Sequence, residues 1–366
     1  MPSTPIRSHR LKTTLSNHAC KSAAPVVFAT ALLAASAGVH AHTFCVSTAT
    51  QLQNALTDSS DGGMYVGEVN QIKVVKGTYK TGAATGNGPF HYSNLSGVGY
   101  FDLQGGWNAG CNQRTQKAAL TVLDGDNATR VLHLRQVANE LDVSSFTIQN
   151  GQTNQIGAGL AINDGSGDNS QVVVTGNIIR DNHTSNSAGG IFASSATSYV
   201  DVYNNLITGN SADAGDGAGE VLAHIGSVEH NTVSRNTTTA TGETGGLYFS
   251  SSSNGFVDYN IFWNNTNAGI YLGSSAVQLD YNDIGMHGGS NPFTFTGDVS
   301  VDPGFVDAAG GNFHLTADSP LLGAMAVDGE YQSVDPDGNA NTLASYGKTD
   351  AGAYNETVFK DGFDGG

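Results

Sequence analysis

The phrase NIIRDN, which begins at Asn177, recurs as NLITGN from Asn205, NTVSRN from Asn231 and NIFWNN from Asn260. An apolar residue stands three positions before the first Asn of each phrase, and another stands two positions after it. The first Asn returns every 26 to 29 residues, and a degenerate fifth copy begins at Asn282. A repeat of this length without a helical period is typical of a solenoid.

The apolar residues around each Asn predict a bend in the chain. Val228 and Val233 are five positions apart, so a straight strand would point them to opposite faces. We therefore expect a bend near Asn231, with the Asn itself in the left-handed conformation. Stacked coils would bring equivalent Asn side chains about 4.8 Å apart, where their amides can form a ladder. The predicted ladder consists of Asn177, Asn205, Asn231, Asn260 and Asn282.

A second recurring element, a Gly followed by apolar residues, lies between the Asn phrases. It occurs at Gly159, Gly190, Gly246 and Gly269, and more weakly at Gly219. This element supplies a further strand to each coil, so three short strands per turn of a parallel β-helix is the simplest solution. The hexapeptide period of a left-handed β-helix is absent. We predict an all-β chain with regular coils over residues 141–300.

The first 41 residues have the pattern of a signal peptide. Arg7, Arg10, Lys12 and Lys21 precede an apolar run, and Val39-His40-Ala41 offers a small-x-small cleavage site. We expect the mature chain to begin at His42 and to be exported to the cell surface, the medium or the periplasm. It would hold 11 basic and 32 acidic residues, a net charge of −21 (11 − 32). Such a chain offers no basic surface for nucleic acid, and the apolar run is too short for a membrane span.

Two cysteines, Cys45 and Cys111, remain after loss of the signal peptide. In an oxidising compartment they are expected to form a disulfide, and the alternative is two free thiols. Residues 42–140 are predicted to be an N-terminal cap with irregular first coils. Ser47 or Thr48 can cap a short helix that places Leu52, Ala55 and Leu56 on one face over the first coil.

The end of the chain carries the motifs VDPGFVD from Val301, NFHLTADSPLLGA from Asn312, DPDGN from Asp335 and TDAGAYN from Thr349. Residues 301–356 thereby resemble the C-terminal part of choice-of-anchor Q domain proteins, which are bacterial surface or secreted β-helices. The repeats resemble the right-handed parallel β-helix superfamily that includes pectate lyase-like proteins. The resemblance implies a right-handed β-helix whose C-terminal coils or cap span 301–356, followed by a flexible tail at 357–366.

The chemistry of pectate lyases and polygalacturonases is disfavoured by the residues present. Between residues 141 and 290 the only Arg or Lys residues are Arg180 and Arg235, two coils apart. They make no basic groove for a uronate, and the Asp-Asp and Gly-His-Gly sets of polygalacturonases are missing. We predict no cofactor and no metal site, since the His residues have no metal-ligand spacing.

One outward-facing column nevertheless combines carboxylates on successive coils. If each Val three before the Asn points inward, the column Thr175, Tyr203, Glu229, Asp258, Asp280 points outward. Glu229, Asp258 and Asp280 are candidate catalytic residues, because glycosidases hold two carboxyl groups about 5 to 9.5 Å apart. Tyr203 is a candidate ligand-binding residue. The alternative is that these are solvated surface acids.

Two function classes remain open at this point. The first is a monomeric, non-catalytic surface or secreted β-helix that binds a polysaccharide or cell-surface glycan, and we favour it because a fold alone implies no chemistry. The second is a glycoside hydrolase that acts on a neutral polysaccharide through the acidic column.

Overall fold

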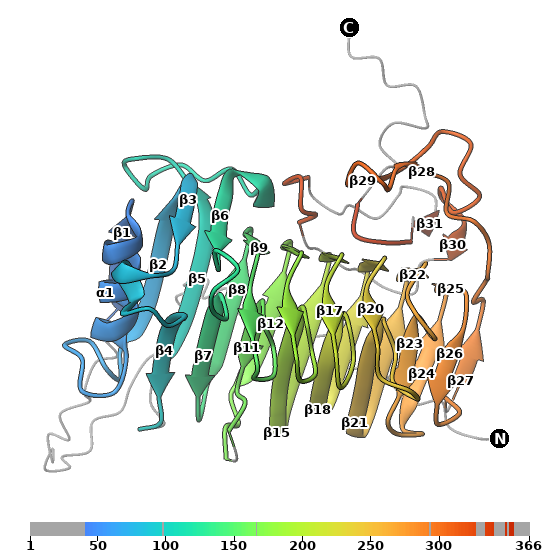
Figure 1. Ribbon diagram of the computed structural model, residues 1–366, viewed down its shortest axis with the longest axis horizontal. Coiled ribbons are helices and arrows are strands. Elements are labelled where there is room, and N and C mark those ends of the chain that lie inside the picture. The colour runs from blue at the N-terminus through green and yellow to red at the C-terminus, as the bar shows by residue number, and fades with distance from the viewer. Residues whose placement is uncertain are drawn as a thin grey trace, which may run out of the picture. The chain divides into compact units, whose positions relative to one another are not determined.

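A computed structural model of the chain describes residues 41–96, 99–165, 167–292, 294–326, 334–339, 348–349 and 351–354. Within these ranges the chain is a parallel β-solenoid of about eight turns, as predicted (Figure 1). The predicted signal peptide, apart from its last residue, and the predicted tail lie outside the described residues.

The largest sheet, sheet A, has two lanes of parallel strands. The first lane contains the strands that begin with the Gly-apolar element, and the second contains the strands that lead to the Asn. In the long strands β15, β18 and β21 the two lanes are continuous, with register shifts after Ser195 and Ala223. First-lane strands are β4 (Phe90–Asn94), β7 (Leu132–Gln136), β11 (Leu160–Ile162), the starts of β15 (Ile191–Tyr203), β18 (Gly219–Glu229) and β21 (Leu247–Asp258), β23 (Ile270–Leu272) and β26 (His287–Gly289). Second-lane strands are β1 (Ala41–Val46), β2 (Val69–Val75), β5 (Tyr100–Trp107), β8 (Glu140–Ser144), β12 (Gln171–Thr175), the ends of β15, β18 and β21, β24 (Val277–Asp280) and β27 (Thr294–Thr296).

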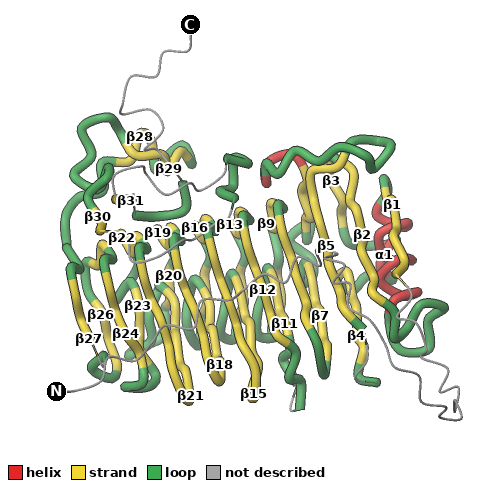
Figure 2. Tube along the Cα trace, turned by 180° about the vertical axis from the view of Figure 1, so that it is seen from behind, coloured by secondary structure: helices red, strands yellow, loops and turns green. Residues whose placement is uncertain are grey.

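Two further parallel sheets lie in the solenoid, one with eight strands and one with four (Figure 2). Sheet B follows the first Asn of each phrase and consists of β3 (Gly77–Lys80), β6 (Thr121–Asp124), β9 (Thr147–Gln149), β13 (Ile178–Arg180), β16 (Leu206–Thr208), β19 (Thr232–Ser234), β22 (Ile261–Trp263) and β25 (Asp283–Ile284). Sheet C follows the second Asn and consists of β10 (Gln152–Thr153), β14 (His183–Thr184), β17 (Ser211–Ala212) and β20 (Thr237–Thr238). The apolar residues on both sides of the bend, such as Val228 and Val233, are fully buried between the sheets.

The first Asn of each phrase forms a continuous buried ladder. The Asn231 amide nitrogen donates to the Asn260 Oδ1 at 3.0 Å, and the Asn231 Oδ1 accepts from the Asn205 backbone N–H at 2.9 Å. The ladder includes Asn177, Asn205, Asn231, Asn260 and Asn282 and ends on Asp298. A parallel second ladder is made by the closing Asn residues Asn182, Asn210, Asn236 and Asn265.

The expectation that the ladder Asn itself is left-handed is wrong. The left-handed residue is the one directly before it, for example His230 with φ 53° and Tyr259 with φ 60°. The ladder Asn is fully buried, because its side chain must point inward to bond along the solenoid axis. The preceding residue therefore makes the turn and points its side chain outward.

The N-terminal end of the solenoid is covered by helix α1 (Ala49–Ser59), which confirms the predicted cap. Thr48 is the N-cap and accepts from the Gln51 N–H, while Leu52 and Leu56 are fully buried. Two short 3₁₀ helices, Ala83–Thr85 and Ala118–Leu120, follow. No helix in the described part of the chain is long and apolar enough to cross a membrane.

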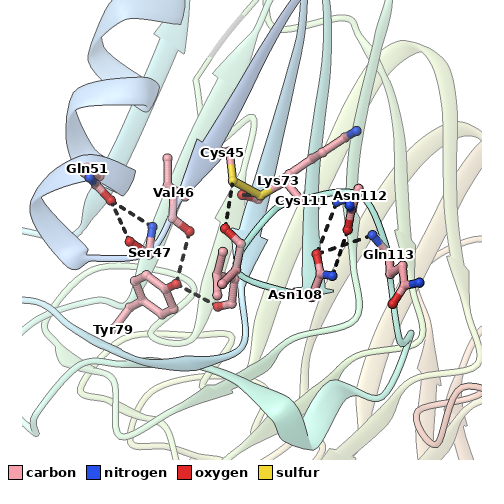
Figure 3. Close-up of a disulfide and its surroundings, with 12 residues drawn as sticks. Cys45, Val46, Ser47, Gln51, Lys73, Tyr79, Asn108, Cys111, Asn112 and Gln113 are labelled. Atoms are coloured by element: carbon pink, nitrogen blue, oxygen red, sulfur yellow. Dashed lines mark hydrogen bonds between the residues drawn. A yellow bond between two sulfur atoms is a disulfide. The ribbon is translucent and has the colours of Figure 1, made fainter.

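The predicted disulfide is confirmed. Cys45 on β1 and Cys111 in the turn after β5 are bonded, with their Cα atoms 5.8 Å apart (Figure 3). Close by, the Tyr79 hydroxyl of β3 donates to the Val46 carbonyl of β1 at 3.2 Å. These contacts tie the capping strand β1 to the first turns.

Residues after Asp302 contribute no further coil within the described ranges. They form two antiparallel pairs, β28 (Phe305–Asp307) with β29 (Asn312–Leu315) and β30 (Met325–Ala326) with β31 (Lys348–Thr349). Leu315 and Leu321 pack on Ile261, and Phe313 packs on Leu206, so this C-terminal segment lies on the outer side of sheet B. Backbone bonds from Gly352 to Tyr259 at 2.7 Å, and from Ala118 to Pro336 at 2.8 Å, fix it along several turns. In Figure 1, β28 and β29 lie beside the sheet B strands.

Candidate functional site

The outer side of the first lane carries an in-register column of aromatic and titratable side chains. Its inward neighbours, such as Ile191 and Leu247, are fully buried, so the alternating residues face outward. The column consists of His91, His133, Ala161, Phe192, Glu220, Tyr248 and Tyr271. Sequence analysis did not single out this column.

Tyr248 and Tyr271 form a stacked pair within the column. Their ring centroids are 5.7 Å apart and their planes are inclined by 15°. Glycines make room for both rings: a Cβ on Gly273 would lie 2.0 Å from the Tyr248 hydroxyl, and one on Gly288 would lie 2.8 Å from the Tyr271 ring. The pair is half-buried, so apolar ring surface and two hydroxyl groups lie together at the surface.

Two carboxyl groups with raised pKa values lie beside this stack. Burial, together with the charges of Glu220 and Glu243, raises the pKa of Asp216 to about 7, although Asp216 accepts the Thr244 N–H at 3.1 Å. Burial likewise raises the pKa of Glu220, which accepts a hydrogen bond from the Ser187 hydroxyl. The Ser187 hydroxyl oxygen also accepts the Asp216 N–H at 3.0 Å, so one serine joins both acids. Carboxyl groups that are partly protonated near neutral pH can both donate hydrogen bonds to hydroxyl groups and accept them.

The sequence contained a signal for this group. Gly219 is in register with the inward residues Ile191 and Leu247, and Glu220 directly follows it. The copy of the Gly-apolar element that has Glu in place of an apolar residue therefore marks the site. Asp216 lies in a loop ahead of β18 and is only 3% exposed.

The N-terminal part of the column ends in an ion network. His133 and Arg130 contact Asp164 at 2.8 and 3.2 Å, and Arg135 contacts Asp168 at 2.9 Å. Burial raises the pKa of Asp164, but the hydrogen bond and charge of His133 and the charges of the two arginines outweigh it and lower the value to about 2. Each charge in this network has a counter-charge, so we assign it a structural role.

The acidic column predicted from the sequence lies in register on the second lane. Tyr203, Glu229, Asp258 and Asp280 occupy equivalent places on β15, β18, β21 and β24, which sets neighbouring backbones about 4.8 Å apart. The Ser227 hydroxyl donates to Glu229. Catalytic roles for these acids, and ligand binding by Tyr203, stay predictions.

A further acid pair lies on the same lane, one outward position earlier in the strands. Asp102 on β5 and Asp142 on β8 are in register, and the Tyr100 hydroxyl donates to Asp142 at 2.6 Å. Burial and the charge of Glu140 raise the pKa of Asp142 to about 8. Burial also raises the pKa of Asp102, which accepts from the side chains of two glutamines.

A polar cavity of about 550 Å³ lies beside sheet C and is lined by Asn127, Thr129, Gln152, Asn154, His183 and Ser185. His183 lies 3.0 Å from the Ser211 hydroxyl and 3.6 Å from Asp213. The side chains of His183 and Asp213 are 41% and 50% exposed, so this trio lacks the enclosed setting that an activated nucleophile requires. Within the described ranges, no three His, Cys, Asp or Glu side chains are grouped to hold a metal ion.

Searches against protein-family models, curated proteins and solved structures find no match to this chain.

Proposed function

We propose that this protein is exported and binds a neutral glycan, without cleaving it, on the outer side of the first lane. The stacked pair of Tyr248 and Tyr271 beside Glu220 is the observation that carries the proposal. The apolar face of a sugar ring packs on tyrosine rings, while its hydroxyl groups bond to carboxyl and phenol groups at the edge.

The charge of the chain favours a neutral ligand. The exported chain without residues 1–41 has a net charge of −21 (11 − 32), which repels polyuronates and sulfated glycans. The raised pKa of Asp216, about 7, keeps this group partly uncharged near neutral pH, and an uncharged carboxyl is less costly to cover with a ligand.

Export is supported by the Cys45–Cys111 bond, since disulfides persist in oxidising compartments. The predicted signal peptide agrees with it. The resemblance of the repeats to pectate lyase-like proteins, and of residues 301–356 to choice-of-anchor Q proteins, favours a location on the cell surface or in the medium.

Glycoside hydrolysis is the second candidate function, and one observation favours it. Asp142, with its raised pKa of about 8, stands in register with Asp102 on the neighbouring strand. A protonated carboxyl and a second carboxyl about 5 Å apart is the arrangement used by retaining glycosidases. The column of Glu229, Asp258 and Asp280 offers the same spacing.

A polysaccharide panel separates the two functions. The purified protein is tested for retardation in gels that contain each polysaccharide, and for the release of reducing ends from the same substrates. We expect retardation by at least one neutral polysaccharide and no release.

Release of reducing ends would overturn the non-catalytic proposal. Asp142→Asn and the double variant Glu229→Gln, Asp258→Asn would then show which acids act, because a catalytic carboxylate cannot be replaced by an amide without a loss of several orders of magnitude.

A further inference from the structure

The two ends of the solenoid differ in how their core is covered. At the N-terminal end, helix α1 buries Leu52 and Leu56 completely against the first turn. At the other end the last strands are β26 and β27, and each pairs with a strand on one side only. Within the described residues no strand pairs with their second edge, which leaves its backbone groups available to another strand.

The last turn exposes a layer of the hydrophobic core. Phe295 is in register with Leu279, which is fully buried, so Phe295 occupies an inward place in the solenoid. It is nevertheless 57% exposed, and no described strand pairs with β27 beyond it. Met286, just before β26, is 58% exposed, and the His287 ring lies 6.3 Å from the Phe295 ring.

The described residues of the C-terminal segment do not close this end. Leu315, Leu321 and Ala351 pack on the outer side of sheet B, and Pro336 bonds to Ala118 near the first turns. These residues follow the flank of the solenoid. None of these packing contacts covers the end of the core at β26 and β27.

The charged residues of the last turn indicate which kind of partner fits this end. Residues 283–300 contain no Lys or Arg, and their two acids, Asp283 and Asp298, accept backbone hydrogen bonds from Val301 and Asn282. The open end therefore offers a basic partner little to pair with. Two exported copies each carry a net charge of −21 (11 − 32), and this end is an apolar surface at which they can approach with little repulsion.

We propose that two copies of this protein associate end to end, with β27 and Phe295 of each copy covering the last turn of the other. A two-fold axis at this interface makes the facing edge strands antiparallel, which is a favourable pairing for hydrogen bonds. Helix α1 covers the core layer at the opposite end, although β1 pairs on one side only there. A further copy therefore finds no open core layer at that end, and the assembly stops at a dimer. A dimer replaces the monomer expected from the sequence.

Sedimentation velocity over a range of protein and salt concentrations tests this proposal. We expect the disulfide-bonded protein to form a dimer that tightens as salt screens the repulsion between copies. Phe295→Lys and Met286→Lys are each expected to weaken the dimer at least tenfold. Val306→Lys is the matched control, since Val306 is 51% exposed on β28 at the flank, and it is expected to leave the dissociation constant unchanged.

Met286 lies outside the strands, so Met286→Lys decides the matter if Phe295→Lys fails to fold. A wild-type protein that is monomeric at every concentration overturns the proposal, as does equal weakening by Val306→Lys. Hydrogen exchange adds a further check: slow exchange of the β27 amides in a monomer would show that another part of the same chain covers the end, and this also overturns the proposal.

Discussion

Replacement of Asn231 by Leu tests the contribution of the first Asn ladder to stability. The two side chains have similar size, so the change removes hydrogen bonds and leaves little cavity. The Asn205 N–H loses its acceptor at 2.9 Å, and the Asn231 amide no longer donates to the Val202 carbonyl and the Asn260 Oδ1. An orphaned buried N–H costs about 1 to 3 kcal/mol and each of the two lost bonds about 1 kcal/mol, so the total is about 3 to 5 kcal/mol.

Urea denaturation followed by circular dichroism and by the fluorescence of the two tryptophans measures this cost. Asn154→Leu is the control, because Asn154 is exposed in a loop and should change stability by no more than about 0.5 kcal/mol. No strain contributes, since the left-handed residue is His230 and not Asn231. A midpoint for Asn231→Leu equal to that of Asn154→Leu would refute the stabilising role of the ladder.

Two further predictions concern the disulfide and pH. Cys111→Ser should lower the free energy of unfolding by about 2 to 5 kcal/mol, because Cys45–Cys111 closes a long loop at the capped end; an unchanged denaturation midpoint would contradict this. Stability should fall as pH rises from about 6.5 to 9, since the pKa of Asp142 is raised to about 8 and that of Asp216 to about 7 in the folded state, against about 3.9 when unfolded. These acids keep their protons in the folded protein and lose them on unfolding, so their contribution is complete below pH 3.9 and is lost as pH rises through the folded values. Melting temperatures at pH 6.5 and 8.5 check the sign, and Asp142→Asn should flatten the difference.

The sequence predicts the bend in each coil because the apolar residues on its two sides are separated by an odd number of positions. Val228 and Val233 can both be buried only if the chain bends between them, and both are buried. The odd spacing does not identify which residue between them makes the turn, so the prediction placed the left-handed residue one position too late. The ladder Asn must point its side chain inward, so the residue before it makes the turn. This requirement becomes visible only when neighbouring coils are aligned.

The flank of sheet B shows a signal that could have been used. Leu206 and Ile261, directly after their Asn, are apolar at an outward position, and the C-terminal segment covers both. The Tyr248–Tyr271 stack was harder to predict, since register between coils of 22 to 29 residues depends on loops of unequal length. The raised pKa of Asp216 depends on burial by such loops, which the pattern of strands does not encode.

Equilibrium binding of one retained neutral polysaccharide to wild-type protein and to Tyr271→Ala tests the central claim most directly. Tyr199→Ala is the control, because Tyr199 is 39% exposed on the second lane, outside the proposed site. Removal of one stacked ring is expected to weaken binding about 5- to 100-fold, the equivalent of about 1 to 3 kcal/mol, while Tyr199→Ala binds as the wild type does. Unchanged affinity of Tyr271→Ala, with a loss in Tyr199→Ala, would contradict glycan binding at the first lane.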